Sequence, residues 1–324
     1  PPGRAARTGE PVAAHAAPAT PPVASAVPAT RVVEADTSRG CRNREYSTLS
    51  RFWELEPDSS CGIFGLRGYH PTDLTLAVSP DRPQTPTSPA PNHTGTQQDY
   101  QKAEMQINLS LRSKLAQGLL TGNDPTRQDS LWFGYTQQSN WQVFNDDLSR
   151  PFRNTDYQPE FMYVYPTDLH LFGGWRWRYA GVGLVHQSNG QSDPLSRSWN
   201  RWYLMTGFEL DNRWQLHAKA WQRIRESAEH DDNPRIQDYI GRGEVKLGWN
   251  VNAQNYLGIT ARGSLGQGRG SGRVEWLRTL GEGWNGGKSN LRLHVQLFSG
   301  YGDSLIDYNY KRTVLSVGFS LLDF

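Results

Sequence analysis

The sequence predicts an all-β protein, a twelve-stranded antiparallel transmembrane β-barrel of the bacterial outer membrane. Three observations predict it: segments in which apolar and polar residues alternate, an even number of such segments, and short turns that alternate with longer loops. The 324-residue chain is rich in Trp, Tyr, Phe and Gly, yet its mean hydropathy is only −0.69. That balance suits a barrel, because lipid-facing and lumen-facing side chains alternate along each strand.

The N-terminal part of the chain differs from the rest. Residues 1–40 are rich in Ala and Pro and almost free of aromatic residues, so they cannot bury enough apolar area to offset the entropy lost on ordering. We expect a disordered periplasmic tail over 1–40 and the barrel over 41–324. The chain opens without Met or a visible signal peptide, which indicates a mature or trimmed product. The sequence leaves open whether Cys41 and Cys61 are bridged, and an oxidising periplasm would favour a disulfide.

Alternation with a period of two is clearest from residue 101 onward. In KAEMQINLSLR (102–112) the odd positions are apolar and the even positions polar, and LRLHVQL (291–297) repeats this pattern. Most segments reach the roughly 9–11 residues that a tilted membrane strand needs. The twelve predicted segments are residues 62–79, 101–116, 130–141, 157–167, 173–188, 198–211, 213–224, 238–250, 254–265, 271–280, 289–301 and 312–323.

The connections predict which way the barrel faces. TGNDP, PTD, DN and NA are tight turns, whereas the longer loops cover 80–100, 142–156, 189–197, 225–237 and 302–311. Long loops of bacterial barrels lie outside the cell, so we expect the tail in the periplasm and the loops 142–156 and 189–197 at the extracellular rim. The last strand, ending VLSVGFSLLDF, places an aromatic residue at the C-terminus, as bacterial outer-membrane proteins do.

Two alternatives remain open at this point. A soluble β-sandwich, acting as a hydrolase or a binding protein, would turn the apolar face of each strand inward and would purify without detergent. A passive pore or structural barrel would keep the same strands, with inward charges that either line a channel or lock into a plug, and conductance in a planar bilayer would separate these outcomes. The expected inward charges are Glu104, Arg242, Glu244, Lys246 and Arg292. A formal net charge of +2 gives no argument for nucleic-acid binding.

The segment GLVHQSNGQSDPLSRSWNRWY (183–203) carries the candidate chemistry. His186 and Ser188 are two residues apart, so they share one strand face with roughly 7 Å between their Cβ atoms. Asn200 enters the next antiparallel strand just after the loop and is expected beside His186. This is the arrangement of a nucleophile, a base and a residue that orients the base. If the apolar face meets lipid, all three residues face outward; on chemistry alone, a polar loop closing a hairpin is the competing interpretation.

The longer string HQSNGQSDPLSRSWNR (186–201) resembles the signature of the outer membrane phospholipase A family, whose members are twelve-stranded barrel enzymes. The blocks that flank it in the same order are LSRFWELEPD (49–58), SPAPNH (88–93), YTQQSNWQ (135–142), PFRNTDYQPE (151–160) and SGYGDSLIDYN (299–309). The likeness runs from about residue 41 to the end of the chain.

The resemblance implies calcium-dependent hydrolysis of the acyl ester bonds of glycerophospholipids at the outer membrane surface, with phospholipase A1, phospholipase A2 and lysophospholipase activity. Ser188 would be the nucleophile, His186 the general base and Asn200 the residue that orients His186. The backbone N–H of Gly190 would stabilise the oxyanion.

The resemblance also implies a Ca²⁺ cofactor and a homodimer. The expected ligands are the backbone of Gln191, the side chain of Ser196 and the backbone of Ser149 of the partner subunit. Gln191 stands where the family usually has Arg, a change that alters local charge but keeps the main-chain oxygen. Gln137, on the lipid-facing side of its strand, corresponds to a glutamine at the family's dimer contact and could pair with its copy across a two-fold axis.

Overall fold

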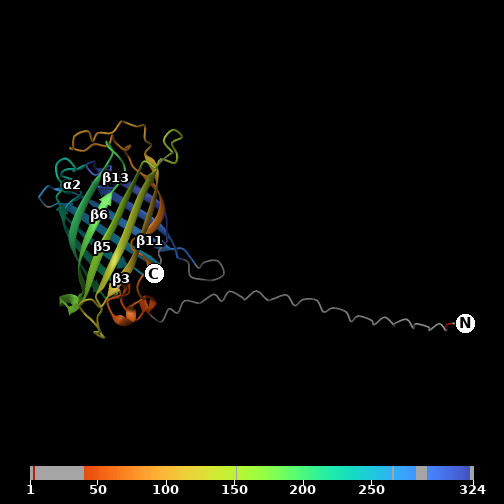
Figure 1. The fold of residues 1–324 in the computed structure, drawn as a ribbon, viewed down its shortest axis with the longest axis vertical. Coiled ribbons are helices and arrows are strands. Elements are labelled where there is room, and N and C mark those ends of the chain that lie inside the picture. The colour runs from red at the N-terminus through yellow and green to blue at the C-terminus, as the bar shows by residue number, and fades with distance from the viewer. Residues whose placement is uncertain (1–2, 4–39, 151, 265, 282–289, 322–324) are drawn as a thin grey trace. The chain divides into compact units, whose positions relative to one another are not determined.

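The alternating segments form strands that pair edge to edge in a closed sheet (Figure 1). The computed structural model describes residue 3 and residues 40–150, 152–264, 266–281 and 290–321. The strands are β1 (Leu66–Gly68), β2 (Thr72–Val78), β3 (Ala103–Gln117), β4 (Ser130–Trp141), β5 (Asn154–His170), β6 (Arg176–Ser188), β7 (Ser198–Leu210), β8 (Trp214–Ile224), β9 (Gly243–Asn250), β10 (Asn255–Ser264), β11 (Arg269–Thr279), β12 (Leu291–Gly300) and β13 (Arg312–Leu321).

The chain divides into two units, Pro1–Ala35 and Asp36–Phe324, and the second contains every strand named above. The predicted disordered tail over 1–40 lies outside the described residues, apart from its residues 3 and 40. The C-terminal aromatic residue, Phe324, also lies outside them.

The barrel has twelve antiparallel strands. From β3 to β13 each strand pairs with the next one along the chain, and β13 pairs with β2, which returns to β3. β1 and β2 lie one after the other along β3, with Leu66 opposite Ser113 and Asp73 opposite Asn108, so they form one interrupted barrel strand. Closure removes the open sheet edges that hydrocarbon surroundings do not tolerate. The predicted fold class is confirmed.

The predicted strand over residues 238–250 is wrong in its first half. A short helix, α2 (Gln237–Ile240), occupies that part, and β9 begins at Gly243. The helix ends at Gly241, whose φ of 102° favours glycine and whose Cβ, if present, would lie 2.2 Å from the carbonyl carbon of Gly263. Arg242 therefore precedes the strand and is exposed.

The burial pattern of the barrel wall is the reverse of that in a soluble protein, because polar side chains are buried and apolar side chains are exposed. On β3 the polar side chains of Glu104, Gln106 and Arg112 are almost fully buried, whereas Leu109 is 41% exposed. The outward apolar residues of β13 are exposed in the same way, as Phe319 illustrates. A surface of this kind is suited to lipid, so the soluble-sandwich alternative is wrong. No helix within the described residues is long and apolar enough to cross a membrane.

Ion pairs join the inward faces of the strands. Lys246 Nζ lies 2.7 Å from Glu275 Oε1, and Arg262 Nε lies 3.3 Å from Glu244 Oε2. Lys246 and Glu244 thus face the lumen as predicted, and they are paired with neighbours from β10 and β11. Charges that neutralise one another between nearby strands of the inner wall favour the plugged state over an open pore.

A helical segment closes one end of the barrel. It contains η1 (Gly40–Arg42), α1 (Thr48–Trp53) and η2 (Pro57–Ser59). Ser47 caps the N-terminus of helix α1, because its hydroxyl accepts a hydrogen bond from the N–H of Ser50. Trp53 is buried with its ring centroid 5.9 Å from that of Trp132 and 5.6 Å from that of Tyr179, both on the inner wall. Figure 1 shows this orange segment at one end of the barrel.

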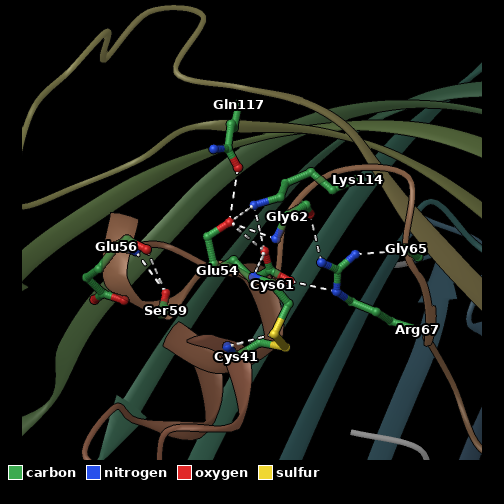
Figure 2. The surroundings of a disulfide bond; sticks show 11 residues. Cys41, Glu54, Glu56, Ser59, Cys61, Gly62, Gly65, Arg67, Lys114 and Gln117 are labelled. Atoms are coloured by element: carbon green, nitrogen blue, oxygen red, sulfur yellow. Dashed lines mark hydrogen bonds and ion pairs between the residues drawn. A yellow bond between two sulfur atoms is a disulfide. The ribbon is translucent and has the colours of Figure 1, made fainter. Parts of the chain in front are cut away.

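A disulfide and a buried carboxylate hold this segment in place (Figure 2). Cys41 and Cys61 are bridged, which answers the question that the sequence left open. Glu54 Oε2 accepts the backbone N–H of Cys61 and lies 2.6 Å from Lys114 Nζ, and Glu54 Oε1 lies 2.7 Å from Arg67 Nε. The side chains of Glu54 and Lys114 are fully buried and that of Arg67 is 11% exposed, so one buried carboxylate compensates both cations.

We expect Glu54→Gln to lower the temperature at which the barrel unfolds, because the variant leaves Lys114 and Arg67 without their carboxylate. Removing one partner of a buried pair typically costs about 3–5 kcal/mol of unfolding free energy. Heat-dependent gel mobility of the detergent-solubilised barrel measures the change. The matched control is Glu45→Gln, an exposed position in the same segment. An unchanged unfolding temperature in Glu54→Gln would show that the cations find other partners.

Longer connections gather at the opposite end, as predicted, and they pack against one another. Ile236, Ile240, Leu305 and Tyr308 come from the β8–β9 and β12–β13 connections and form a buried cluster with Trp199 at the start of β7. The rim beside the β6–β7 loop is therefore an ordered assembly of loops.

Candidate active site

The β6–β7 hairpin carries the predicted catalytic residues. Strand β6 ends at Ser188 and β7 begins at Ser198, with residues 189–197 between them. In the antiparallel register His186 lies opposite Asn200. Val182 and Leu184 share the face of His186 and are 43% and 56% exposed, whereas Val185 is buried on the other face. His186, Ser188 and Asn200 therefore face outward at the loop end of the wall, where the alternation predicted them.

A hydrogen bond joins two of the three residues. His186 Nδ1 lies 2.8 Å from Asn200 Oδ1. Within the described residues, no side-chain hydrogen bond joins Ser188 Oγ to His186. Catalytic hydrogen bonds in free enzymes are often long and tighten only when substrate binds, so the spacing of the two residues on one strand face is the informative feature.

Gly190 lies in the turn that follows Ser188. Its φ of 63° is in the left-handed region, which favours glycine. A Cβ at this position would also lie 3.0 Å from Cε2 of Tyr157, the residue that pairs with Ser188 across β5 and β6. Glycine thus allows the backbone to turn close to the Tyr157 ring immediately after the candidate nucleophile.

The side chain of Asn189 organises the loop, a feature that the sequence analysis missed. Its Nδ2 donates to the carbonyl of Leu195 at 2.8 Å, and its Oδ1 accepts from the N–H of Arg197 at 2.9 Å. Asn189 is 3% exposed, so these bonds are shielded from water. An asparagine directly after a strand is a signal for such a turn, because its side chain can replace backbone hydrogen bonds.

A buried ion-pair network lies under this loop. The backbone carbonyl of Arg153 accepts from Nε2 of Gln191 at 3.4 Å, and the Arg153 guanidinium contacts Glu104 and Asp307. Burial would lower the pKa of Arg153, but these two carboxylates raise it above its ordinary value. Burial would likewise raise the pKa of Asp307, whereas Arg153 and Arg312 hold it below its ordinary value. The network therefore stays charged and supports the β6–β7 loop from below.

The predicted calcium ligands lie in two loops. Gln191 and Ser196 belong to the β6–β7 loop, and Ser149 belongs to the β4–β5 loop, where its carbonyl accepts from the indole N–H of Trp141 at 2.7 Å. Ser196 Oγ donates to Asp232 Oδ2 at 2.5 Å. A carboxylate from the β8–β9 connection thus lies beside one of the predicted ligands.

Two further side chains join that carboxylate, and the sequence analysis missed both of them. His93 Nε2 lies 3.0 Å from Asp193 Oδ1 and 3.5 Å from Asp232 Oδ1, while His93 Nδ1 is 2.7 Å from the carbonyl oxygen of Pro91. The cluster joins three loops. The acidic pair in HDDNP (230–234) was a possible signal, but its partners are far away in sequence.

A family model described as phospholipase A1 matches residues 49–321 of the chain. The chain belongs to the phospholipase A1 family. Its members are hydrolases, and the twelve-stranded barrel matches the outer-membrane fold of the family. The predicted family is thereby confirmed.

The relatives of this phospholipase A1 family chain include enzymes and solved barrels. It is similar to a putative phospholipase A1 of Neisseria meningitidis serogroup B, with 37% identity over 283 residues, which cover 86% of this chain and 71% of the relative. It is also similar to the Salmonella typhi outer membrane phospholipase, solved as a dimer with bound calcium, with a TM-score of 0.68, 33% identity, and coverage of 80% and 93%. A third relative is an active-site mutant of outer membrane phospholipase A from Escherichia coli in which an asparagine is replaced by alanine, with a TM-score of 0.67, 31% identity, and coverage of 81% and 94%.

In this phospholipase A1 family chain, residues that pair across neighbouring strands form a lateral row on the wall. The row runs from Gln137, the predicted dimer residue, to Ser188, the candidate nucleophile. Gln137 lies between Leu109 of β3 and Tyr157 of β5, and Tyr157 lies opposite Ser188 of β6. Leu109 and Tyr157 are 41% and 36% exposed, so the row faces outward. Two strand spacings, about 10 Å, separate Gln137 from Ser188.

Proposed function

We propose that this chain is a calcium-dependent phospholipase A of the outer membrane surface, with Ser188 as nucleophile, His186 as general base and Asn200 as the residue that orients His186. Its substrates are the acyl esters of glycerophospholipids, with phospholipase A1, phospholipase A2 and lysophospholipase activity. The observation that carries the proposal is the 2.8 Å hydrogen bond between His186 Nδ1 and Asn200 Oδ1 on the outward face that also bears Ser188. The asparagine at the active site of the Escherichia coli relative supports the role of Asn200.

The reaction proceeds in two halves. Ser188 Oγ attacks the ester carbonyl while His186 Nε2 takes the hydroxyl proton, and the carbonyl oxygen becomes an oxyanion that accepts the backbone N–H of Gly190. The C–O bond to the glycerol then breaks, and His186 returns the proton to the leaving alcohol. Water attacks the acyl-enzyme with His186 again as base, and Ser188 regains its proton as the fatty acid leaves. Asn200 holds the ring throughout.

Calcium is part of the proposal because the solved Salmonella typhi relative contains it. The donor set of this chain fits the ion: the Ser196 hydroxyl lies against the Asp232 carboxylate, and Ca²⁺ takes oxygen ligands. The backbone oxygen of Gln191, the hydroxyl of Ser196 and the backbone oxygen of Ser149 of the partner subunit would hold it. When bound, calcium supplies positive charge that favours the developing oxyanion. The oxygen of Gln191 is a main-chain atom, so the replacement of the usual Arg leaves this donor in place.

The active form in this proposal is a homodimer that assembles through the Gln137 row. Because that row continues to Ser188, a second copy docked on Gln137 would cover the approach to the nucleophile and form a groove for an acyl chain. The N-terminal tail is periplasmic, and the catalytic rim faces the outer leaflet. Activity would then appear only where monomers meet in a membrane that contains accessible phospholipid.

We expect Gln137→Ala to weaken self-association. The amide accepts from Tyr135 and donates to Ser139 in its own chain, which uses half of its hydrogen-bonding capacity and leaves the rest for a second copy. Sedimentation equilibrium in detergent with calcium and a non-hydrolysable substrate analogue measures the dimer fraction. Gln222→Ala, an outward-facing glutamine on β8, is the matched control. Equal self-association of both variants and the wild type would contradict the role of Gln137.

Fatty-acid release from phospholipid in mixed micelles tests the proposed activity. We expect release with calcium and none with a chelator. Equal release under both conditions would contradict the calcium requirement, and no release with calcium from confirmed dimers would contradict the enzyme itself.

A further inference from the structure

Asn200 has a second partner besides His186. Its Nδ2 donates to Glu226 Oε1 at 2.8 Å. Glu226 lies two residues beyond Ile224, the residue of β8 that pairs with Asn200, so the carboxylate reaches Asn200 from the neighbouring strand end. His186 of β6, Asn200 of β7 and Glu226, just beyond the end of β8, thus form a continuous hydrogen-bonded chain.

Glu226 is itself held in place. Its Oε2 accepts from the guanidinium of Arg223 at 3.1 Å, and the same guanidinium group lies 2.6 Å from Asp231 Oδ1. The side chain of Arg223 is 7% exposed and that of Glu226 is 18% exposed, so both contacts are largely shielded from water. A charge-assisted pair of this kind fixes the position of a carboxylate better than a solvated loop residue would.

The chemistry of the three side chains determines which group donates and which accepts in each hydrogen bond. An ionised carboxylate only accepts hydrogen bonds, so the side of the Asn200 amide that meets Glu226 is its NH₂ group. The carbonyl oxygen of Asn200 then faces His186, and since that oxygen only accepts, His186 Nδ1 carries the ring proton. Nε2 is left with a free lone pair, which is the state that a general base for Ser188 requires.

We propose that Glu226 is a positioning residue that selects the orientation of the Asn200 amide and, through it, the tautomer of His186. Without the carboxylate, the Asn200 amide can turn over and present its NH₂ group to Nδ1, which then favours the proton on Nε2 and removes the base. The catalytic consequence, a free Nε2 on His186 that acts as the base, rests on the proposed function. The tautomer of His186 is a property of the folded chain alone.

The kinetic test is a double-mutant cycle between Glu226→Gln and Asn200→Asp. Glutamine can accept or donate, so Glu226→Gln no longer selects one amide orientation, and we expect kcat to fall about tenfold with KM unchanged, as for the loss of one charge-assisted hydrogen bond. Asn200→Asp presents oxygen to His186 in either orientation and repels Glu226. In that background we expect Glu226→Gln to raise kcat instead.

The matched control is Glu229→Gln, an exposed position in the same connection, for which we expect no change in either background. A purely structural role for Glu226 predicts a loss of activity of the same sign in both backgrounds, together with a lower unfolding temperature. Either that result or an unchanged kcat in Glu226→Gln would overturn the proposal. Glu226→Ala removes the hydrogen-bond acceptor altogether, and we expect it to lower kcat at least as much as Glu226→Gln does.

A readout that does not need activity separates this proposal from the proposed function. In protein labelled with ¹⁵N-histidine, the two ring nitrogen shifts report which nitrogen carries the proton, and the His186→Asn variant identifies the signals of His186. We expect protonated Nδ1 in the wild type and a mixture of tautomers in Glu226→Gln. Identical shifts in both would overturn the role of Glu226 even in an active enzyme. The expected shifts in an inactive protein would support that role and leave only the hydrolase contradicted.

Discussion

Replacing Ser188 with Ala is expected to abolish calcium-dependent fatty-acid release, with a fall of at least about a thousandfold in kcat. The alanine lacks the oxygen that attacks the ester, so neither the acyl-enzyme nor the tetrahedral species before it can form. What remains is any rate enhancement that comes from binding and from the oxyanion donor alone. The measurement is hydrolysis of phospholipid in mixed micelles, for wild type and variant, with calcium and with a chelator.

Ser299→Ala is the control for this experiment, because Ser299 is an exposed serine near the loop end of β12. We expect that variant to retain wild-type activity. If Ser188→Ala kept most of the activity, the nucleophile would have to be another group. If the wild type were inactive with calcium in confirmed dimers, the barrel would be a pore or scaffold, and the paired charges of its lumen would favour the scaffold.

Much of the candidate catalytic hairpin could be predicted from the sequence because strand faces follow a period of two. Once the apolar residues Val182 and Leu184 were assigned to the lipid side, His186 and Ser188 had to follow them, and the burial of these strands agrees. The two strands are consecutive and antiparallel, so the sequence also predicted Asn200 beside His186, and the observed register places the two residues opposite one another.

The missed features all depend on contacts between segments that are far apart in the sequence. Glu226 reaches Asn200 from an adjacent strand end, and Asp232 reaches Ser196 across two connections. Loop residues have no periodicity that would show which way they face. The helix α2 was missed for a related reason, since four residues of helix within a loop are too few to show a 3.6-residue pattern.

The tight turn at Gly190 makes Gly190→Ala the substitution with the second large expected effect. An added methyl group meets two obstacles: a backbone φ of 63°, which residues with a side chain adopt at a cost, and the Tyr157 ring, 3.0 Å from the new Cβ. Relief of either obstacle requires the turn to rotate, and the N–H of residue 190 rotates with it. Loss of one oxyanion donor typically lowers kcat by about 10²–10³-fold, and we expect an effect of that size.

The kinetic pattern distinguishes a displaced donor from a damaged barrel. An oxyanion forms only in the course of reaction, so kcat and kcat/KM should fall together while KM and the unfolding temperature stay close to those of the wild type. Gly272→Ala is the matched control, because a Cβ at Gly272 of β11 meets no atom within 4 Å. We expect this variant to leave kcat, kcat/KM, KM and the unfolding temperature unchanged. A rise in KM with kcat preserved in Gly190→Ala would mean that this turn contacts the bound substrate and contributes nothing specific to the transition state. The Gly190 N–H would then have to be replaced in the mechanism by another donor near Ser188.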